Sequence, residues 1–228
     1  VLERIKSNKQ SGLLGINIGP NKDTENRLND YIECLKTFYE VADYITVNIS
    51  SPNTKDLRNF HEQTKLNELL ETIDKEKKNL NSKIPIAVKV SPDIEDQEIH
   101  KICEVLLNNN IEVIIISNSS DSTRETLNNI QKHQKGGLSG KPIENKSTKL
   151  INKFFKILKG RIKIIGVGGV DSGRGAYEKF LAGANYIQLY TGMVFRGPNI
   201  VNMIKKELKE ILAKDGVKNY TEIIGKKG

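Results

Sequence analysis

Short polar side chains follow an apolar run at residues 44–49, and their types suit the orientation of a small polar ligand. From Thr46 to Arg58 the sequence reads TVNISSPNTKDLR, so amides and hydroxyls come directly after the run. Such groups, mounted where a strand ends, form hydrogen bonds from rigid positions. Pro52 cannot continue a sheet, so a loop begins there. An ordinary turn rich in Asn and Ser explains the same residues equally well, because these side chains favour turns.

Ser51 is the best candidate in this stretch for proton transfer, since no Cys, Asp or Glu stands at the centre of the polar set. A serine is a poor base and needs a relay through water or a second hydroxyl, which Thr54 could supply. The GxSxG pattern of hydrolases is missing around Ser51, which argues against acyl transfer. The three histidines have no metal-type spacing, and we predict surface or loop positions for His61, His100 and His133.

Lys89 lies within the apolar run 84–90. Burying an ammonium group is costly unless its charge has a partner. One interpretation is a side chain that extends from an exposed face into solvent. The other is a cation directed at an anionic ligand or an electron-rich cofactor. Asp93, just beyond Lys89, could cap the helix that follows.

Two glycine-containing turns could hold a phosphate group. Gly168 and Gly169 follow one apolar run, and Thr191 and Gly192 follow the next. Backbone N–H groups without a Cβ in the way, each followed by a helical pattern, attract anions. A single Gly-Gly pair is more often a tight turn, but barrels of alternating strands and helices commonly bind phosphate between their last two strands.

The elements that position these residues alternate regularly along the chain. Short β-branched runs, each followed by an amphipathic pattern, predict a parallel sheet covered by helices. The expected strands are residues 13–18, 44–49, 84–90, 112–117, 162–167 and 186–190. The expected helices are residues 24–41, 63–79, 96–108, 146–158, 173–182 and 200–214.

The polar residues at the strand ends favour a (β/α)8 barrel over an open doubly wound sheet. A doubly wound sheet concentrates ligand groups near one switch point, whereas a barrel takes them from many strands at one face. Here each of the six predicted strands ends in polar or glycine residues. A barrel needs eight strands, so we expect about two βα units to lie upstream of Val1. Residues 1–228 are expected to form a single domain.

Composition narrows the class of protein further. The net charge of +8 raises the question of nucleic-acid binding, but the lysines are scattered among acidic residues on helical patterns, which is typical of solvated faces. Cys34 and Cys103 lie on helical patterns without paired spacing and are expected to be reduced. No apolar run approaches the roughly 18 residues of a transmembrane helix, and a targeting signal upstream of Val1 would be missing from the sequence.

Six motifs in order carry a resemblance to a known family. They are GINIGPNKDT at residues 15–24, NISSPNT at 48–54, IAVKVSPD at 86–93, GGLSG at 136–140, IIGVGGVDS at 164–172 and QLYTG at 188–192. Through these motifs the chain closely resembles the class 2, quinone-linked dihydroorotate dehydrogenases over nearly its whole length. That family forms a (β/α)8 barrel that binds FMN at its C-terminal mouth.

The resemblance implies a role for each matching residue. Ser51 would be the catalytic base that removes a proton from C5 of dihydroorotate while hydride leaves C6, and a serine rather than a cysteine here indicates class 2. Lys89 would lie near flavin N1 and O2, where its charge stabilises reduced flavin. The implied substrate-binding residues are Asn48, Asn53, Asn118 and Ser119. The implied FMN-binding residues are Asn17, Asn48, Lys89, Ser117, Gly140, Gly169, Tyr190 and Thr191. No metal is implied.

The chain departs from the family pattern at several positions. Lys55 and Asp56 replace the usual Pro-Gly after the NT pair, so we expect the loop to lose its Pro-Gly turn and to differ in mobility. Ser117 and Ser119 stand in for threonines and keep the hydroxyl, and Pro20 replaces a common Lys. The first two barrel strands, with their flavin loop and substrate lysine, and the N-terminal helices of the quinone tunnel are expected upstream.

The resemblance and the missing N-terminal segments also imply which partners the protein has and where in the cell it lies. The substrates would be dihydroorotate and a ubiquinone-type quinone, with orotate as the product and no nucleic acid. The missing N-terminal segment would attach the protein peripherally to the bacterial inner membrane, on its cytoplasmic face, or to the mitochondrial inner membrane. A barrel of six strands has exposed edges, so residues 1–228 alone are expected to be unstable or inactive. Two alternatives stay open: a flavin barrel resembling tRNA dihydrouridine synthases, which Ser51 in place of a Cys acid disfavours, and an inactive or scaffold fragment.

Overall fold

Six parallel strands form one sheet in the order β1-β2-β3-β4-β5-β6 in the computed structural model, which describes residues 1–8, 11–54, 57–122, 124–125 and 127–227. The strands are β1 (Gly15–Ile18), β2 (Tyr44–Asn48), β3 (Ile86–Val90), β4 (Val113–Ile116), β5 (Lys163–Val167) and β6 (Tyr186–Gln188). The α-helices are α1 (Leu2–Ser7), α2 (Arg27–Phe38), α3 (Gln63–Asn79), α4 (Asp96–Asn108), α5 (Glu144–Leu158), α6 (Gly173–Ala182), α7 (Thr191–Arg196) and α8 (Ile200–Lys214). Short 3-10 helices are η1 (Leu57–His61), η2 (Ile130–His133), η3 (Lys141–Ile143) and η4 (Tyr220–Ile223).

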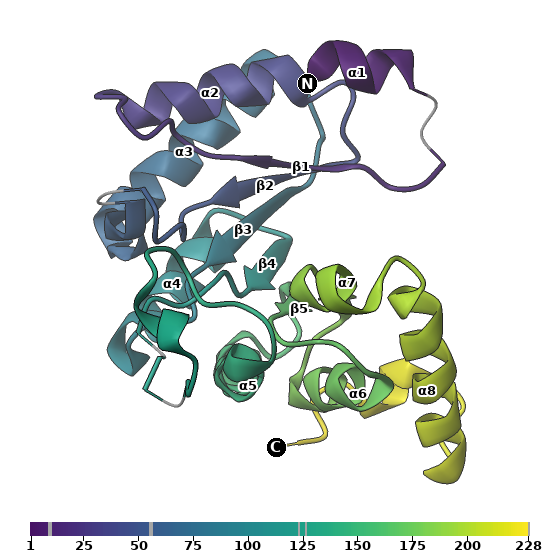
Figure 1. Cartoon of the computed structure of the whole chain (residues 1–228). Coiled ribbons are helices and arrows are strands. Elements are labelled where there is room, and N and C mark those ends of the chain that lie inside the picture. Colours follow the sequence, from purple (N-terminus) through teal and green to yellow (C-terminus); the bar gives the residue numbers. More distant parts are fainter. Residues whose placement is uncertain (9–10, 55–56, 123, 126, 228) are drawn as a thin grey trace.

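The sheet is strongly curled. In Figure 1 the strands follow an arc from β1 at the top toward β5 near the centre, with α2 to α6 on its outer side. The Gln188 side chain of β6 donates a hydrogen bond of 3.2 Å to the Tyr44 hydroxyl of β2. Those strands are four places apart in the sheet, about 19 Å if it were flat. The six strands therefore form the greater part of a (β/α)8 barrel, as the strand-end pattern predicted.

Alternation along each strand separates an apolar outer face from a more polar inner face. On β2, Ile45 and Val47 belong to the main hydrophobic core, whereas Asn48 stays half-buried at the strand end. On β3, Val88 and Val90 belong to the same core and Lys89 lies between them. Because Asn48 is in register with Lys89, both side chains are placed on the concave side of the sheet.

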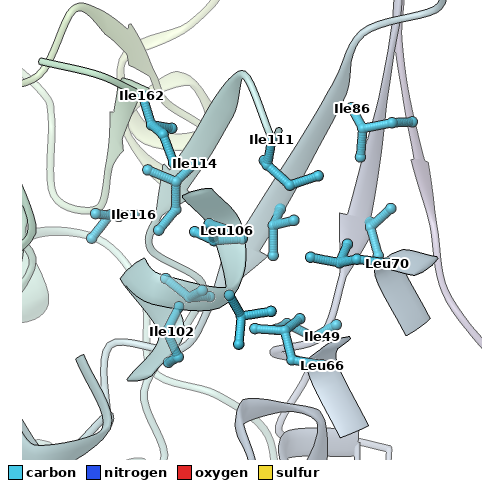
Figure 2. Packing of buried hydrophobic residues seen from close by; sticks show 14 of the residues in the cluster. Ile49, Leu66, Leu70, Ile86, Ile102, Leu106, Ile111, Ile114, Ile116 and Ile162 are labelled. Atoms are coloured by element: carbon cyan, nitrogen blue, oxygen red, sulfur yellow. The ribbon is translucent and has the colours of Figure 1, made fainter. Parts of the chain in front are cut away.

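The core lies between the outer face of the sheet and the surrounding helices. Figure 2 shows Leu66 and Leu70 of α3 and Ile102 and Leu106 of α4 packed toward the strand residues. The labelled isoleucines of the strands and adjoining segments are Ile49, Ile86, Ile111, Ile114, Ile116 and Ile162. Helical residues spaced three or four apart present one apolar stripe, which explains why each helix covers the sheet with a single face.

The predicted elements are confirmed, with small differences at their ends. α3, α4, α6 and α8 begin and end at the predicted residues, whereas the strands are up to two residues shorter at either end. α2 begins three residues later than predicted because the Asn26 side chain caps it, accepting from the Asn29 N–H at 3.1 Å. Helices α1 and α7 were not predicted from the sequence. Both are only six residues long, too short to show a helical period.

Two further observations concern the chemistry of the chain. Cys34 and Cys103 are free thiols on α2 and α4, as predicted. In the described part of the chain, no helix is both long and apolar enough to cross a bilayer.

Candidate functional site

A cavity of about 290 Å³ lies at the carboxyl ends of β3 to β6. Eight of the twelve predicted site residues line it. They are Lys89, Ser117, Asn118, Ser119, Gly140, Gly169, Tyr190 and Thr191. These residues come from four strand ends and from the long loop before α5, so the curl of the sheet brings them together.

Lys89 is a cation without a partner in this cavity wall. Its side chain is half-buried on β3, and burial lowers the pKa of its ammonium group. Among the residues that the structure describes, none forms a hydrogen bond or an ion pair with it. A desolvated cation facing a cavity stabilises negative charge placed there. This geometry supports the ligand-directed interpretation of Lys89 and not an extension into solvent.

The wall built from Gly140, Gly168, Gly169, Tyr190 and Thr191 is called the glycine wall below. Gly169 has a φ of 76°, and a Cβ built on it would lie 2.7 Å from the Glu144 Cα. Gly140 has a φ of 78°, and a Cβ there would lie 2.8 Å from the Thr191 Cγ2. Only glycine fits both positions. Backbone N–H groups can therefore approach a ligand closely here, as phosphate binding requires.

The opposite part of the mouth is held by side chains, here called the amide cluster: Asn48, Ser50 and Asn118. The Asn118 amide donates to the Ser50 hydroxyl at 2.9 Å and to the Asn48 Oδ1 at 3.3 Å. Ser50 in turn donates to the Asn48 Oδ1 at 2.7 Å. These bonds fix the amides of β2 and β4 relative to each other. Asn48 thus joins the site through Asn118, although it does not line the cavity itself.

Ser51 and Asn53 lie beside the cavity. The Ser51 Oγ accepts a hydrogen bond of 3.3 Å from the Asn53 N–H, and the Ser51 side chain is half-buried. Their loop packs near the glycine segment before α5, since a Cβ on Gly137 would lie 2.9 Å from the Pro52 Cγ. In the described part of the chain, no hydrogen bond joins the Ser51 and Thr54 hydroxyls. The relay through Thr54 stays a prediction, and the predicted change of turn at Lys55 and Asp56 lies outside the described residues.

Asn17, like Asn48, Ser51 and Asn53, is a predicted site residue that does not line the cavity. It lies on the edge strand β1, in register with Thr46, and its side chain is exposed. Its predicted contact with the flavin stays a prediction.

Asp93 has a different role from the predicted helix cap. Glu95 caps α4 instead, with Glu98 completing a capping box. The Asp93 carboxylate accepts from the Ser120 hydroxyl at 2.6 Å and from the Asp121 N–H at 3.1 Å. It is 10% exposed and forms ion pairs with Lys146 and with Arg58, the latter at 3.2 Å.

Opposing effects set the charge of Asp93. Burial alone would raise its pKa, but the Lys146 ammonium and the Ser120 and Ser122 hydroxyls hold the pKa well below its usual range. The charged carboxylate therefore connects η1, the loop that follows β4, and α5. This role of Asp93 could not be predicted from the local sequence, because its partners lie 27 to 53 residues away along the chain.

His61 corrects a second prediction. It is 6% exposed rather than on the surface, and its Nε2 accepts a hydrogen bond of 3.4 Å from the Ser91 N–H. Burial, with a smaller effect from the Arg58 charge, lowers the pKa of His61 to about 4. His100 and His133 are exposed, as predicted. Among the described residues, no group of three His, Cys, Asp or Glu side chains is placed to hold a metal ion.

Comparisons with known proteins agree with this geometry. The family model described as "Dihydroorotate dehydrogenase" matches residues 1–212. A protein named "Dihydroorotate dehydrogenase (quinone)" from Bartonella tribocorum is 43% identical over 225 residues, covering 96% of this chain and 62% of its own length. A protein of the same name from Vibrio vulnificus is 44% identical over 216 residues, covering 91% of this chain and 64% of its own length. The chain thus spans less than two thirds of the length of these relatives.

A solved structure is also similar. Ligand-free DHODH from Eimeria tenella superimposes with a TM-score of 0.93 at 33% identity, over 99% of this chain and 68% of that one. The tRNA dihydrouridine synthase alternative is not favoured by these matches. The strand ends, the cavity and the family match all lead to one assignment: the chain belongs to the dihydroorotate dehydrogenase family.

Proposed function

We propose that the full-length protein oxidises dihydroorotate to orotate in pyrimidine synthesis, with FMN as the hydride acceptor and a quinone as the final acceptor. The observation that carries the proposal is the cavity itself. Its lining brings together eight predicted substrate and flavin residues, among them Lys89, which has no partner among the residues that the structure describes. The relatives named as quinone-linked enzymes support the same reaction, and this chain spans 62% and 64% of the length of two of them.

Enzymes of this family are flavoproteins, and the residues present fit FMN. The glycine wall offers backbone N–H groups to a phosphate, and Lys89 offers a positive charge to the electron-rich end of a flavin ring. Ser117, at the end of β4, and Asn17 are the further residues proposed to bind the flavin. When bound, the flavin supplies a two-electron acceptor for the hydride from C6. Residues 1–228 would form one FMN-binding domain.

The amide cluster would orient the substrate. Asn48 and Asn118 are already fixed to each other through Ser50, so their remaining donors and acceptors are positioned before the substrate binds. Asn53 and Ser119, on neighbouring loops, would complete the contacts to the orotate ring and carboxylate. Amides and hydroxyls suit this ligand because its ring carries both N–H donors and carbonyl acceptors.

Ser51 would take the proton from C5 of dihydroorotate. Its Oγ already accepts one hydrogen bond, from the Asn53 N–H, which orients the side chain and leaves a lone pair available. A serine hydroxyl is a weak base, so the proton must pass onward through water or a second hydroxyl. The loss of this proton and of the hydride yields orotate, and the two electrons leave with the quinone as quinol.

We further propose that the protein acts at a membrane. Quinones are lipid-soluble, so an enzyme that reduces them must reach the bilayer. A segment outside this chain would provide peripheral attachment to a bacterial or mitochondrial inner membrane. Nucleic acid is not a proposed partner, because the basic residues are spread over helix faces.

The test uses the full-length protein mixed anaerobically with dihydroorotate while flavin absorbance is followed. Wild-type flavin should bleach, and Ser51→Ala should slow bleaching by about 10²-fold while the flavin stays bound. Ser7→Ala, which removes an exposed hydroxyl on α1, is the matched control and should bleach at the wild-type rate. Wild-type flavin that stays oxidised would refute the substrate, and equal bleaching in Ser51→Ala would refute the base.

A further inference from the structure

A buried lysine outside the predicted site has no role in the reaction proposed above. Lys179 on α6 is 0% exposed, and its ammonium donates to the Ser147 and Thr148 hydroxyls of α5, each at 3.1 Å. Within the described residues, no carboxylate forms an ion pair with it. Burial of a charge held only by neutral hydroxyls is costly, and an apolar side chain would pack there at lower cost.

A short path of contacts leads from Lys179 to the glycine wall. The Ser147 hydroxyl, which accepts from Lys179, donates to the Val167 carbonyl at the end of β5. The same carbonyl accepts the Ser117 N–H at 3.1 Å. A Cβ built on Gly168 would lie 3.2 Å from the Ser147 Oγ. The ammonium is therefore separated from the turn at Gly168 by a single hydroxyl.

Two cations and two carboxylates lie near that turn, and both carboxylates, Glu144 and Asp171, pair with Lys141 and not with Lys179. Glu144 lies nearby, but its Oε2 pairs with the Lys141 ammonium at 2.8 Å. Its Oε1 is buried and has no hydrogen-bond partner. Burial lowers the pKa of Lys179 to about 8, while Glu144 partly opposes that effect. The side chain is therefore mainly protonated at neutral pH.

We propose that Lys179 is a positioning residue for a phosphate monoester held at the Gly168–Gly169 turn. Its ammonium fixes Ser147, and through it the Val167 carbonyl and the turn, and it adds positive charge behind the backbone N–H groups. This inference rests on the proposed function, in which the phosphate belongs to FMN. It explains why a charge is retained where the packing alone would favour an apolar residue.

The test compares two flavins on the full-length apoprotein. Riboflavin has the ring and ribityl chain of FMN but no phosphate, so the ratio of the two dissociation constants isolates the phosphate. Lys179→Met should weaken FMN binding about 10-fold or more, as expected for one charge acting over a few ångströms of protein. Riboflavin binding should change less than about twofold. Quenching of flavin fluorescence on binding measures both constants.

Two further variants test whether the effect depends on the location of Lys179 and on its contact with Ser147, and not only on the loss of a positive charge. Lys149→Met removes an exposed lysine of α5, next to Thr148, and should leave the ratio unchanged. Ser147→Ala keeps the ammonium but removes the hydroxyl between it and the turn, and should lower the preference for FMN in the same direction. If Lys179→Met does not fold, Ser147→Ala decides the question alone.

The outcomes distinguish this inference from the proposed function. Equal weakening of FMN and riboflavin, or an unchanged ratio in both Lys179→Met and Ser147→Ala, would overturn the inference. If wild-type FMN is nevertheless reduced by dihydroorotate, the proposed function survives that result. A wild-type apoprotein that binds no FMN would overturn both.

Discussion

The glycine wall and the amide cluster lie at the same cavity but are built by different means. The glycine wall uses backbone: Gly140 and Gly169 have positive φ, and an added Cβ at either position would overlap neighbouring atoms. The amide cluster uses side chains, with Asn118 bonded to Asn48 and Ser50 across two strand ends. The shape of the glycine turns can change only if the backbone moves. The hydrogen bonds of the amide cluster can change when a few side chains rotate.

This difference matches the lifetimes of the ligands that we propose for each region. A cofactor stays bound through many turnovers, so a rigid backbone cradle costs nothing in rate. A substrate must enter and leave, so its contacts are better placed on loops whose hydrogen bonds can open. The ion pairs of Asp93 with Arg58 and Lys146 then limit how far those loops move.

The largest effect is expected from breaking the glycine wall. In Gly169→Ala the new Cβ would meet the Glu144 backbone and would require a positive φ in a residue with a side chain. Backbone movement at the turn should weaken FMN binding on the order of 10³-fold, from strain and overlap together. The measurement is the flavin dissociation constant of the full-length protein.

A control for this variant exists within the chain. Gly160 also has a φ of 78°, but a Cβ there would meet nothing within 4 Å. Gly160→Ala should therefore lose some stability, about 1 kcal/mol, and keep wild-type flavin affinity. Equal loss of flavin in both variants would show that backbone strain, and not the cradle, is responsible.

A smaller effect is expected from loosening the side-chain region. Asp93→Asn leaves Lys146 and Arg58 without their shared carboxylate, so we expect a loss of about 3 kcal/mol in the free energy of unfolding. The β4 loop should become mobile and raise the KM for dihydroorotate about 10-fold, with flavin affinity unchanged. Asp96→Asn removes an exposed carboxylate paired with Lys153 and is the control. Loss of flavin from Asp93→Asn would erase the contrast between the two regions.

The smallest effect is expected on the free energy of unfolding at acidic pH, through His61. His61 has a pKa of about 4 in the folded protein, against 6.5 for an ordinary histidine, so the fold favours the neutral ring. Its contribution to stability is complete above pH 6.5 and is lost as the pH falls toward 4. At pH 5 the loss is about 2 kcal/mol.

Urea unfolding of the full-length protein at pH 7 and pH 5 measures this loss. His61→Gln should show a smaller decrease between the two pH values than the wild type. His100→Gln, at an exposed position, should behave like the wild type. Asp93 does not interfere, because the stability that its lowered pKa contributes is complete above the ordinary aspartate pKa of 3.8 and is lost only at lower pH. An equal decrease in wild type and His61→Gln would refute the assignment.

The sequence alone determined the alternation of strands and helices and the chemistry of the strand ends. Apolar runs and helical stripes are local patterns, so the bounds of α3 and α8 could be predicted to the residue. The ends of parallel strands meet at one edge of a sheet, which is why Lys89 and Gly169 could be predicted to share one site, and both line the same cavity. The resemblance added the identity of the ligands.

Only the tertiary structure decided which charged side chains form ion pairs and which of those described have no ion-pair partner. Asp93 is predicted from sequence to be a helix cap, and it instead pairs with Arg58 and Lys146, far away along the chain. His61 is predicted from sequence to lie on the surface or in a loop, and it is buried. Lys179, for which the sequence predicted no role, is buried as well. The burial of a side chain and the pairing of its charge depend on residues that the curl of the sheet brings together from distant parts of the chain. A local sequence pattern does not identify those residues.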